Sequence, residues 1–123
     1  MANINILTVD DSVSMRMLLR AALTGAGHQI AEAEDGVAAL EWLESHHKPD
    51  LVITDINMPR MDGFGLIEQI RALPQYRDMP ILVLTTESTD AKKARARAAG
   101  ATGWIVKPFD PEQLNNVIRR VTH

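Results

Sequence analysis

The chain has 123 residues, 46% of them apolar and 24% charged, which is enough to bury one sizeable core, and we expect a single domain over residues 1–123. The absence of cysteine excludes disulfides, thiolate metal sites and a thiol nucleophile, and a net charge of −3 is too small to indicate nucleic-acid binding. No apolar stretch approaches the length of a membrane span, and the N-terminus lacks the pattern of a leader peptide, so we expect a cytoplasmic protein without membrane association.

The first elements establish an alternation of strand and helix. Ile4–Val9 is an almost unbroken apolar run, as expected for a central strand buried on both faces, whereas polar interruptions in His28–Ala33 favour an edge strand. Between them, Ser12–Ala26 has helical spacing, and Asp11 or Ser12 can cap its start. The apolar stripe of this helix is predicted to be Met15, Leu18, Leu19, Ala22 and Leu23.

The alternation continues to the C-terminus. The predicted elements are a helix over Gly36–His46, a strand over Leu51–Thr54, a helix over Phe64–Leu73, a strand over Ile81–Leu84, a helix over Asp90–Ala99, a strand over Gly103–Val106 and a helix from Pro111 to Val121. Five strand–helix units with short connections predict an α/β fold in which helices cover both faces of a parallel sheet, a (βα)5 three-layer sandwich.

Reactive side chains follow the predicted strands. Asp10 and Asp11 end the first, Asp55 the third, Thr85 the fourth, and Lys107 the fifth. The carboxyl ends of parallel strands meet at one edge of the sheet, where α/β proteins bind ligands. Two carboxylates about 4 Å apart repel by about 4 kcal/mol at an effective dielectric of about 20, so a cation should offset three of them.

Oxygen ligands of this kind suit Mg²⁺. Each acid could instead cap a helix or start a turn, but that interpretation leaves the convergence of Asp10, Asp11 and Asp55 with Thr85 and Lys107 unexplained. A carboxylate can also attack phosphorus and form an acyl phosphate. We expect Asp55 to be the reacting group, because it ends a central strand between the acidic pair and the hydroxyl and ammonium groups.

Four ordered motifs carry a family resemblance over essentially the whole chain. They are VDDS at Val9–Ser12, DINMPRMDG at Asp55–Gly63, LTTE at Leu84–Glu87 and GWIVKPF at Gly103–Phe109. The chain thereby resembles the receiver domain of two-component response regulators, and within that family the single-domain chemotaxis regulators. The resemblance implies a flavodoxin-like fold with strand order 2-1-3-4-5.

The resemblance also implies roles for individual residues. Asp55 would be the phospho-acceptor, and Mg²⁺, with Mn²⁺ as a substitute, would bind Asp11, Asp55 and the carbonyl of Asn57 directly and Asp10 through water. Lys107 would contact the phosphoryl group, with a cis Lys107–Pro108 bond. Thr85 would move toward that group. Trp104 would be an aromatic switch residue. Asn57 and Glu87 would tune the rate of dephosphorylation.

The implied phosphodonor is a histidine kinase of the CheA type, and the implied output is a flagellar motor switch protein bound by a monomer. The face made by the fourth helix, fifth strand and fifth helix would carry this signal. Trp104 is larger than the aromatic residues usual at its position, so it could instead simply pack at the sheet edge. The basic residues of the fourth helix fit either a solvated face or a docking surface for an acidic segment: Lys92, Lys93, Arg95 and Arg97.

Alternative functions remain open at this stage. A phosphate sink or a phosphorelay intermediate would use the same site. An aspartate-nucleophile phosphohydrolase usually has a second Asp two residues after its nucleophile, where this chain has Asn57. A flavodoxin needs a phosphate loop after the first strand, where Asp10 and Asp11 would repel phosphate. We therefore expect a switch that promotes its own phosphorylation and dephosphorylation, not an enzyme with a separate substrate.

Overall fold

The computed structural model describes residues 3–122, which contain one five-stranded parallel sheet. The strand order is β2-β1-β3-β4-β5, as the resemblance implies. The strands are β1 (Asn5–Val9), β2 (Gln29–Ala33), β3 (Leu51–Thr54), β4 (Ile81–Thr85) and β5 (Gly103–Val106). The polar β2 lies at an edge and the apolar β1, β3 and β4 lie inside, which confirms the distinction drawn from their composition.

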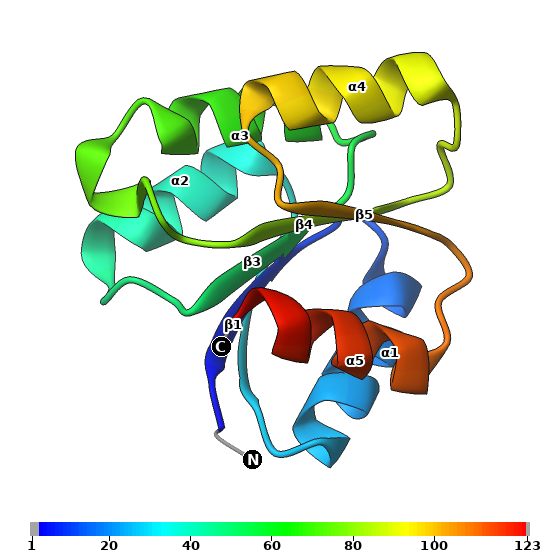
Figure 1. The fold of residues 1–123 in the computed structure, drawn as a ribbon. Coiled ribbons are helices and arrows are strands. Elements are labelled where there is room, and N and C mark those ends of the chain that lie inside the picture. Colours follow the sequence, from blue (N-terminus) through cyan, green and yellow to red (C-terminus); the bar gives the residue numbers. More distant parts are fainter. Residues whose placement is uncertain (1–2, 123) are drawn as a thin grey trace.

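Five α-helices cover the two faces of the sheet, with α1 and α5 on one face and α2, α3 and α4 on the other (Figure 1). Their bounds are α1 (Val13–Gly25), α2 (Gly36–Ser45), α3 (Gly63–Arg71), α4 (Asp90–Ala99) and α5 (Pro111–Val121). This arrangement confirms the predicted three-layer sandwich. Within residues 3–122, no helix is both long enough and apolar enough to cross a membrane.

Alternation along the central strands divides the core in two. In β4, Ile81 and Val83 pack toward α2, α3 and α4, whereas Leu82 and Leu84 pack toward α1 and α5. All four side chains are at most 1% exposed. A strand buried on both faces needs apolar residues at every position, which explains the unbroken apolar runs seen in the sequence.

The first helix differs in part from its prediction. Ser12 is the N-cap and accepts a hydrogen bond from the Met15 amide, so the helix proper begins at Val13. Leu19 and Leu23 are buried, but Leu18 is 56% exposed and does not belong to the buried stripe. Residues at i and i+1 point about 100° apart on a helix, so a narrow contact with the sheet covers Leu19 and leaves its neighbour outside.

The sequence patterns also missed one short element. After α3, a 3-10 turn, η1, spans Pro74–Tyr76. Tyr76 is buried and its hydroxyl donates to the Leu43 carbonyl, 3.1 Å away, which ties this turn to the end of α2. A three-residue turn is too short to produce a periodic apolar pattern, and Pro74 reads equally well as a plain helix stop.

Candidate functional site

Backbone hydrogen bonds extend the sheet just beyond the strand ends and hold three of the predicted site residues there. The amide of Asp10 donates to Ala33 O (3.1 Å), that of Asp55 to Val9 O (2.9 Å), and that of Lys107 to Thr85 O (2.8 Å). The two acidic groups follow β1 and β3, whose connections leave in opposite directions across the sheet. They therefore lie at the topological switch point, where α/β folds bind ligands.

The three carboxylates meet at this point as the sequence predicts. Asp10, Asp11 and Asp55 each place a carboxylate oxygen within 4.8 Å of the others. Asp10 and Asp55 are 2% and 8% exposed, whereas Asp11 is exposed. The cluster is thus two buried carboxylates with a third at the mouth, open to solvent on one side.

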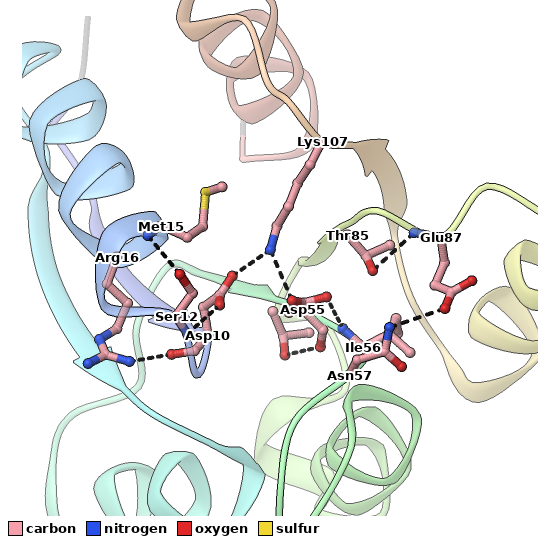
Figure 2. Close-up of polar contacts among 11 residues, drawn as sticks. Asp10, Ser12, Met15, Arg16, Asp55, Ile56, Asn57, Thr85, Glu87 and Lys107 are labelled. Atoms are coloured by element: carbon pink, nitrogen blue, oxygen red, sulfur yellow. Dashed lines mark hydrogen bonds and ion pairs between the residues drawn. The ribbon is translucent and has the colours of Figure 1, made fainter.

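Lys107 reaches into this cluster from the far side of β4. Figure 2 shows its ammonium between two carboxylates, and Lys107 Nζ is 2.8 Å from Asp10 Oδ2 and 2.9 Å from Asp55 Oδ2. Burial alone would lower the pKa of Lys107, but hydrogen bonds to Asp10 and Asp55 and their charges outweigh it, and the pKa lies above its usual value. The ammonium therefore stays charged at physiological pH. The Lys107–Pro108 peptide bond is cis, the geometry that the resemblance implies.

Backbone amides fix the other oxygen of each buried acid. Ser12 N donates to Asp10 Oδ1 at 2.9 Å, and Ile56 N donates to Asp55 Oδ1 at 2.6 Å. Each carboxylate thus has one oxygen committed to the backbone and the other to Lys107. Hydrogen bonds to ionised carboxylates are among the stronger ones, so both side chains are held in a defined orientation before any ligand arrives.

A second group of side chains lies on the β4 side of Asp55, and Figure 2 shows three of its members, Asn57, Thr85 and Glu87. The Asn57 amide donates to Glu87 Oε1 at 3.1 Å, the Glu87 amide donates to Thr85 Oγ1 at 3.3 Å, and Trp104 Nε1 donates to the Glu87 carbonyl at 3.1 Å. Thr85 is fully buried and Trp104 half-buried. All four residues singled out in the sequence are therefore connected through Glu87.

Sequence reasoning did not connect Lys92 to this group. Lys92 Nζ lies 2.9 Å from Glu87 Oε2. Hydrogen bonds from Lys92 and then Asn57 hold the pKa of Glu87 below its usual value, so its carboxylate is ionised at neutral pH. The five-residue spacing of the pair, with a loop and a helix start between them, is not one of the regular helical pairings that a sequence reveals.

The loop after Asp55 is also held by an ion pair that the sequence did not indicate. Arg60 has a left-handed backbone (φ 65°), and its guanidinium makes two hydrogen bonds to Asp35, of 2.7 and 3.0 Å. Asp35 in turn caps α2 by accepting from the Ala38 amide. The pKa of Asp35 is lowered, chiefly by Arg60. A left-handed conformation at a non-glycine residue is the kind of feature that surrounding contacts must hold in place.

The chemistry of the cluster fits a divalent cation. Three carboxylates and one ammonium leave two negative charges at the point where the acid oxygens converge. Hard oxygen donors on one side and open solvent on the other match the habit of Mg²⁺, which binds a few protein oxygens and retains several waters. Asp10, Asp11 and Asp55 could supply these oxygens.

The chain therefore has a five-stranded parallel sheet of order 2-1-3-4-5 with an acidic cluster and a lysine at its switch point. Residues 6–119 match the response regulator receiver domain family, and the chain belongs to that family. It is a receiver domain of the two-component systems.

Among its relatives is a Campylobacter jejuni protein described as a chemotaxis protein CheY homolog, 42% identical over 117 residues that cover 94% of this chain and 90% of the relative. The structure of the chemotaxis response regulator CheY4 of Vibrio cholerae matches with a TM-score of 0.91 and 42% identity, covering 98% of this chain and 99% of the other. The receiver domain of a Pseudomonas aeruginosa sensor histidine kinase matches with a TM-score of 0.90 and 26% identity, covering 98% of each chain. That structure contains a magnesium ion coordinated in its active-site cleft.

Proposed function

We propose that this receiver takes a phosphoryl group from a histidine kinase phosphohistidine onto Asp55 and passes the signal to a partner as a chemotaxis messenger. The observation that carries the proposal is the setting of Asp55. Its carboxylate is nearly buried, oriented by the Ile56 amide, paired with Lys107 and placed within reach of two further acids. An aspartate that served only to begin a turn would need none of these partners.

In the proposed reaction an Asp55 carboxylate oxygen attacks phosphorus in line with the phosphohistidine nitrogen. The P–O bond forms as the P–N bond breaks, the imidazole leaves with the electron pair and takes up a proton, and an acyl phosphate remains. Lys107, already 2.9 Å from Asp55, would move to a phosphoryl oxygen and offset the charge it brings. The buried Thr85 hydroxyl is the second group proposed to contact the phosphoryl oxygens.

The residues that would hold Mg²⁺ are Asp11, Asp55 and the Asn57 carbonyl, with Asp10 acting through a bound water. When bound, Mg²⁺ supplies charge neutralisation on the transferring group. Without that charge Asp10, Asp11 and Asp55 would repel an incoming phosphate, since Lys107 offsets only one of the three. Mn²⁺ has the same preference for oxygen ligands and would substitute.

Dephosphorylation is the second half of the proposed cycle. A water attacks phosphorus, the bond from phosphorus to the Asp55 oxygen breaks, and inorganic phosphate leaves while the carboxylate is regenerated. Asn57 and Glu87 would control that water in this proposal, which their mutual hydrogen bond of 3.1 Å supports. The receiver would promote both halves on itself and turn over no separate substrate.

Trp104 is the proposed link to the output face. It is anchored to the loop after β4 by the bond from its indole N–H to the Glu87 carbonyl, and the amide of Glu87 donates to Thr85, the last residue of β4. A shift of Thr85 toward the phosphoryl group would therefore be transmitted to β5 and its surface with α4 and α5. Similarity to chemotaxis regulators supports a cytoplasmic monomer, residues 1–123 forming a single receiver, that takes its phosphoryl group from a CheA-type kinase and binds a flagellar motor switch protein.

The metal requirement tests this proposal. Incubation with acetyl phosphate in Mg²⁺ should add one phosphoryl group by intact-mass measurement, and EDTA should prevent it. Asp11→Asn, which removes a metal ligand, should need about tenfold more Mg²⁺ for the same labelling. The matched control is Asp78→Asn at an exposed loop position, which should label like the wild type. Labelling that proceeds equally in EDTA would contradict the proposal.

A further inference from the structure

The Glu87 carboxylate is held from both sides. One oxygen accepts from Asn57 of the loop after β3, and the other lies 2.9 Å from the ammonium of Lys92 in the first turn of α4. Glu87 therefore joins the loop beside Asp55 to a helix on the surface of the molecule. With Asn57 as its only partner, the carboxylate would have one oxygen without a hydrogen bond, and the side chain could rotate away.

The start of α4 fixes the position from which Lys92 reaches back. Thr89 is the N-cap of the helix, and its hydroxyl accepts from the Lys92 amide at 3.3 Å. The backbone of Lys92 is thus part of the capped first turn, and its side chain extends to the residue two positions before the cap. The Lys92 and Glu87 side chains are 43% and 25% exposed. An ion pair this exposed contributes little to folding stability, so stability alone gives no reason for the contact.

We propose that Lys92 is a positioning residue for dephosphorylation: it holds the Glu87 carboxylate against Asn57, across the approach that a water takes to a phosphoryl group on Asp55. The inference rests on the proposed function of Asp55. Loss of the ammonium leaves Glu87 held by Asn57 alone. The path of water to the phosphoryl group is then open for a larger fraction of the time, so the acyl phosphate decays faster.

The same geometry couples α4 to the lifetime of the signal. A partner that offers a carboxylate to the basic side chains of α4 competes with Glu87 for Lys92. Such a partner would shorten the life of the acyl phosphate while it is bound. An acidic segment docked on α4 without touching Lys92 would not have this effect.

The test is the decay rate of protein labelled with acetyl phosphate and Mg²⁺, then freed of the donor and followed by phosphate release. Lys92→Gln should decay about two- to fivefold faster than the wild type, the range expected from loss of one exposed ion pair. Lys92→Arg keeps the charge and reach and should restore most of the wild-type lifetime. Lys48→Gln removes the same charge from an exposed residue at the opposite end of the strands, and its decay should match the wild type.

A double-mutant cycle separates positioning from a general effect of charge. In a Glu87→Gln background the ion pair no longer exists, so Lys92→Gln should cause no further acceleration. An unchanged decay rate for Lys92→Gln, or an equal acceleration in both backgrounds, would overturn the inference while leaving Asp55 as the acceptor. Failure of the wild type itself to take label would instead overturn the proposed function, and this inference with it.

Discussion

At the scale of single residues, the site is organised by one ammonium among three carboxylates. Lys107 is the only positive group within ion-pairing distance of Asp10 or Asp55 in the described part of the chain. It offsets part of the repulsion between acids that are largely buried. The remaining negative charge can be neutralised by a divalent cation. Lys107 and a bound cation would therefore share one role, since each would stabilise the same cluster of negative charge.

Removal of Lys107 should reveal that shared role. Lys107→Met leaves two buried carboxylates without a counter-ion, so in EDTA the free energy of unfolding should fall by about 2 kcal/mol. Mg²⁺ should restore most of the loss and bind more tightly than to the wild type, because the competing ammonium is gone. Urea unfolding with and without Mg²⁺ measures both effects. Equal stability of the variant and the wild type in EDTA would contradict this account of the charges.

Sequence reasoning brought Asp10, Asp55 and Lys107 together, but it did not find the ion pairs of Lys92 and Arg60. Asp10 and Asp55 directly follow strands, so their positions are determined by the backbone, and the strand pattern is enough to bring them together. The side chains of Lys92 and Arg60 have several rotatable bonds and can therefore reach several different partners. Their ion pairs with Glu87 and Asp35 depend on how loops are folded, which composition and periodicity do not record.

At the scale of elements, the loop that follows Asp55 is closed by a tight contact at the start of α3. The amide of Gly63 donates to the Ile56 carbonyl at 2.8 Å. A Cβ at Gly63 would lie 2.2 Å from the Asp55 carbonyl oxygen and 2.8 Å from Ile56 Cα, both backbone atoms that cannot turn aside. The absence of a side chain at Gly63 is what lets α3 begin directly against the backbone at the end of β3.

Two glycine substitutions form a matched test of this contact. Gly63→Ala should lower the free energy of unfolding by about 2–3 kcal/mol through overpacking, and should weaken Mg²⁺ binding by displacing the Asp55 backbone. Gly25→Ala at the end of α1 meets nothing within 4 Å and has an ordinary backbone, so it should be neutral or stabilising by up to about 1 kcal/mol. Chemical unfolding measures both changes. Similar stabilities for the two variants would show that the contact is not critical.

The element pattern itself could be predicted from the sequence, with ends shifted by one or two residues. The start of α1 moved by one residue because its capping residue, Ser12, lies outside the helix proper, whereas α2, α4 and α5 begin at the predicted residues. The exposed Leu18 shows why a helical stripe drawn from the sequence is too wide, since only the side chains nearest the sheet are covered. Both differences depend on local packing geometry, which the spacing of apolar residues in the sequence does not specify.

At the scale of the whole molecule, the strand order is what makes a site from separate strand ends. The alternation of strands and helices predicts a parallel sheet covered on both faces, but it leaves open which strands are neighbours. Family resemblance supplied the order 2-1-3-4-5, and the structure confirms it. With β1 between β2 and β3, Asp10 and Asp55 end adjacent strands, so their carboxylates lie close enough for one cation to contact both.

The most direct test of the whole account is which side chain takes the phosphoryl group. Wild type and Asp55→Asn are incubated with acetyl phosphate and Mg²⁺, and intact masses are compared. The account predicts one added phosphoryl group on the wild type and none on Asp55→Asn, since the amide is neither a nucleophile toward phosphorus nor an anionic metal ligand. Equal labelling of Asp55→Asn would contradict the assignment of Asp55 as the acceptor.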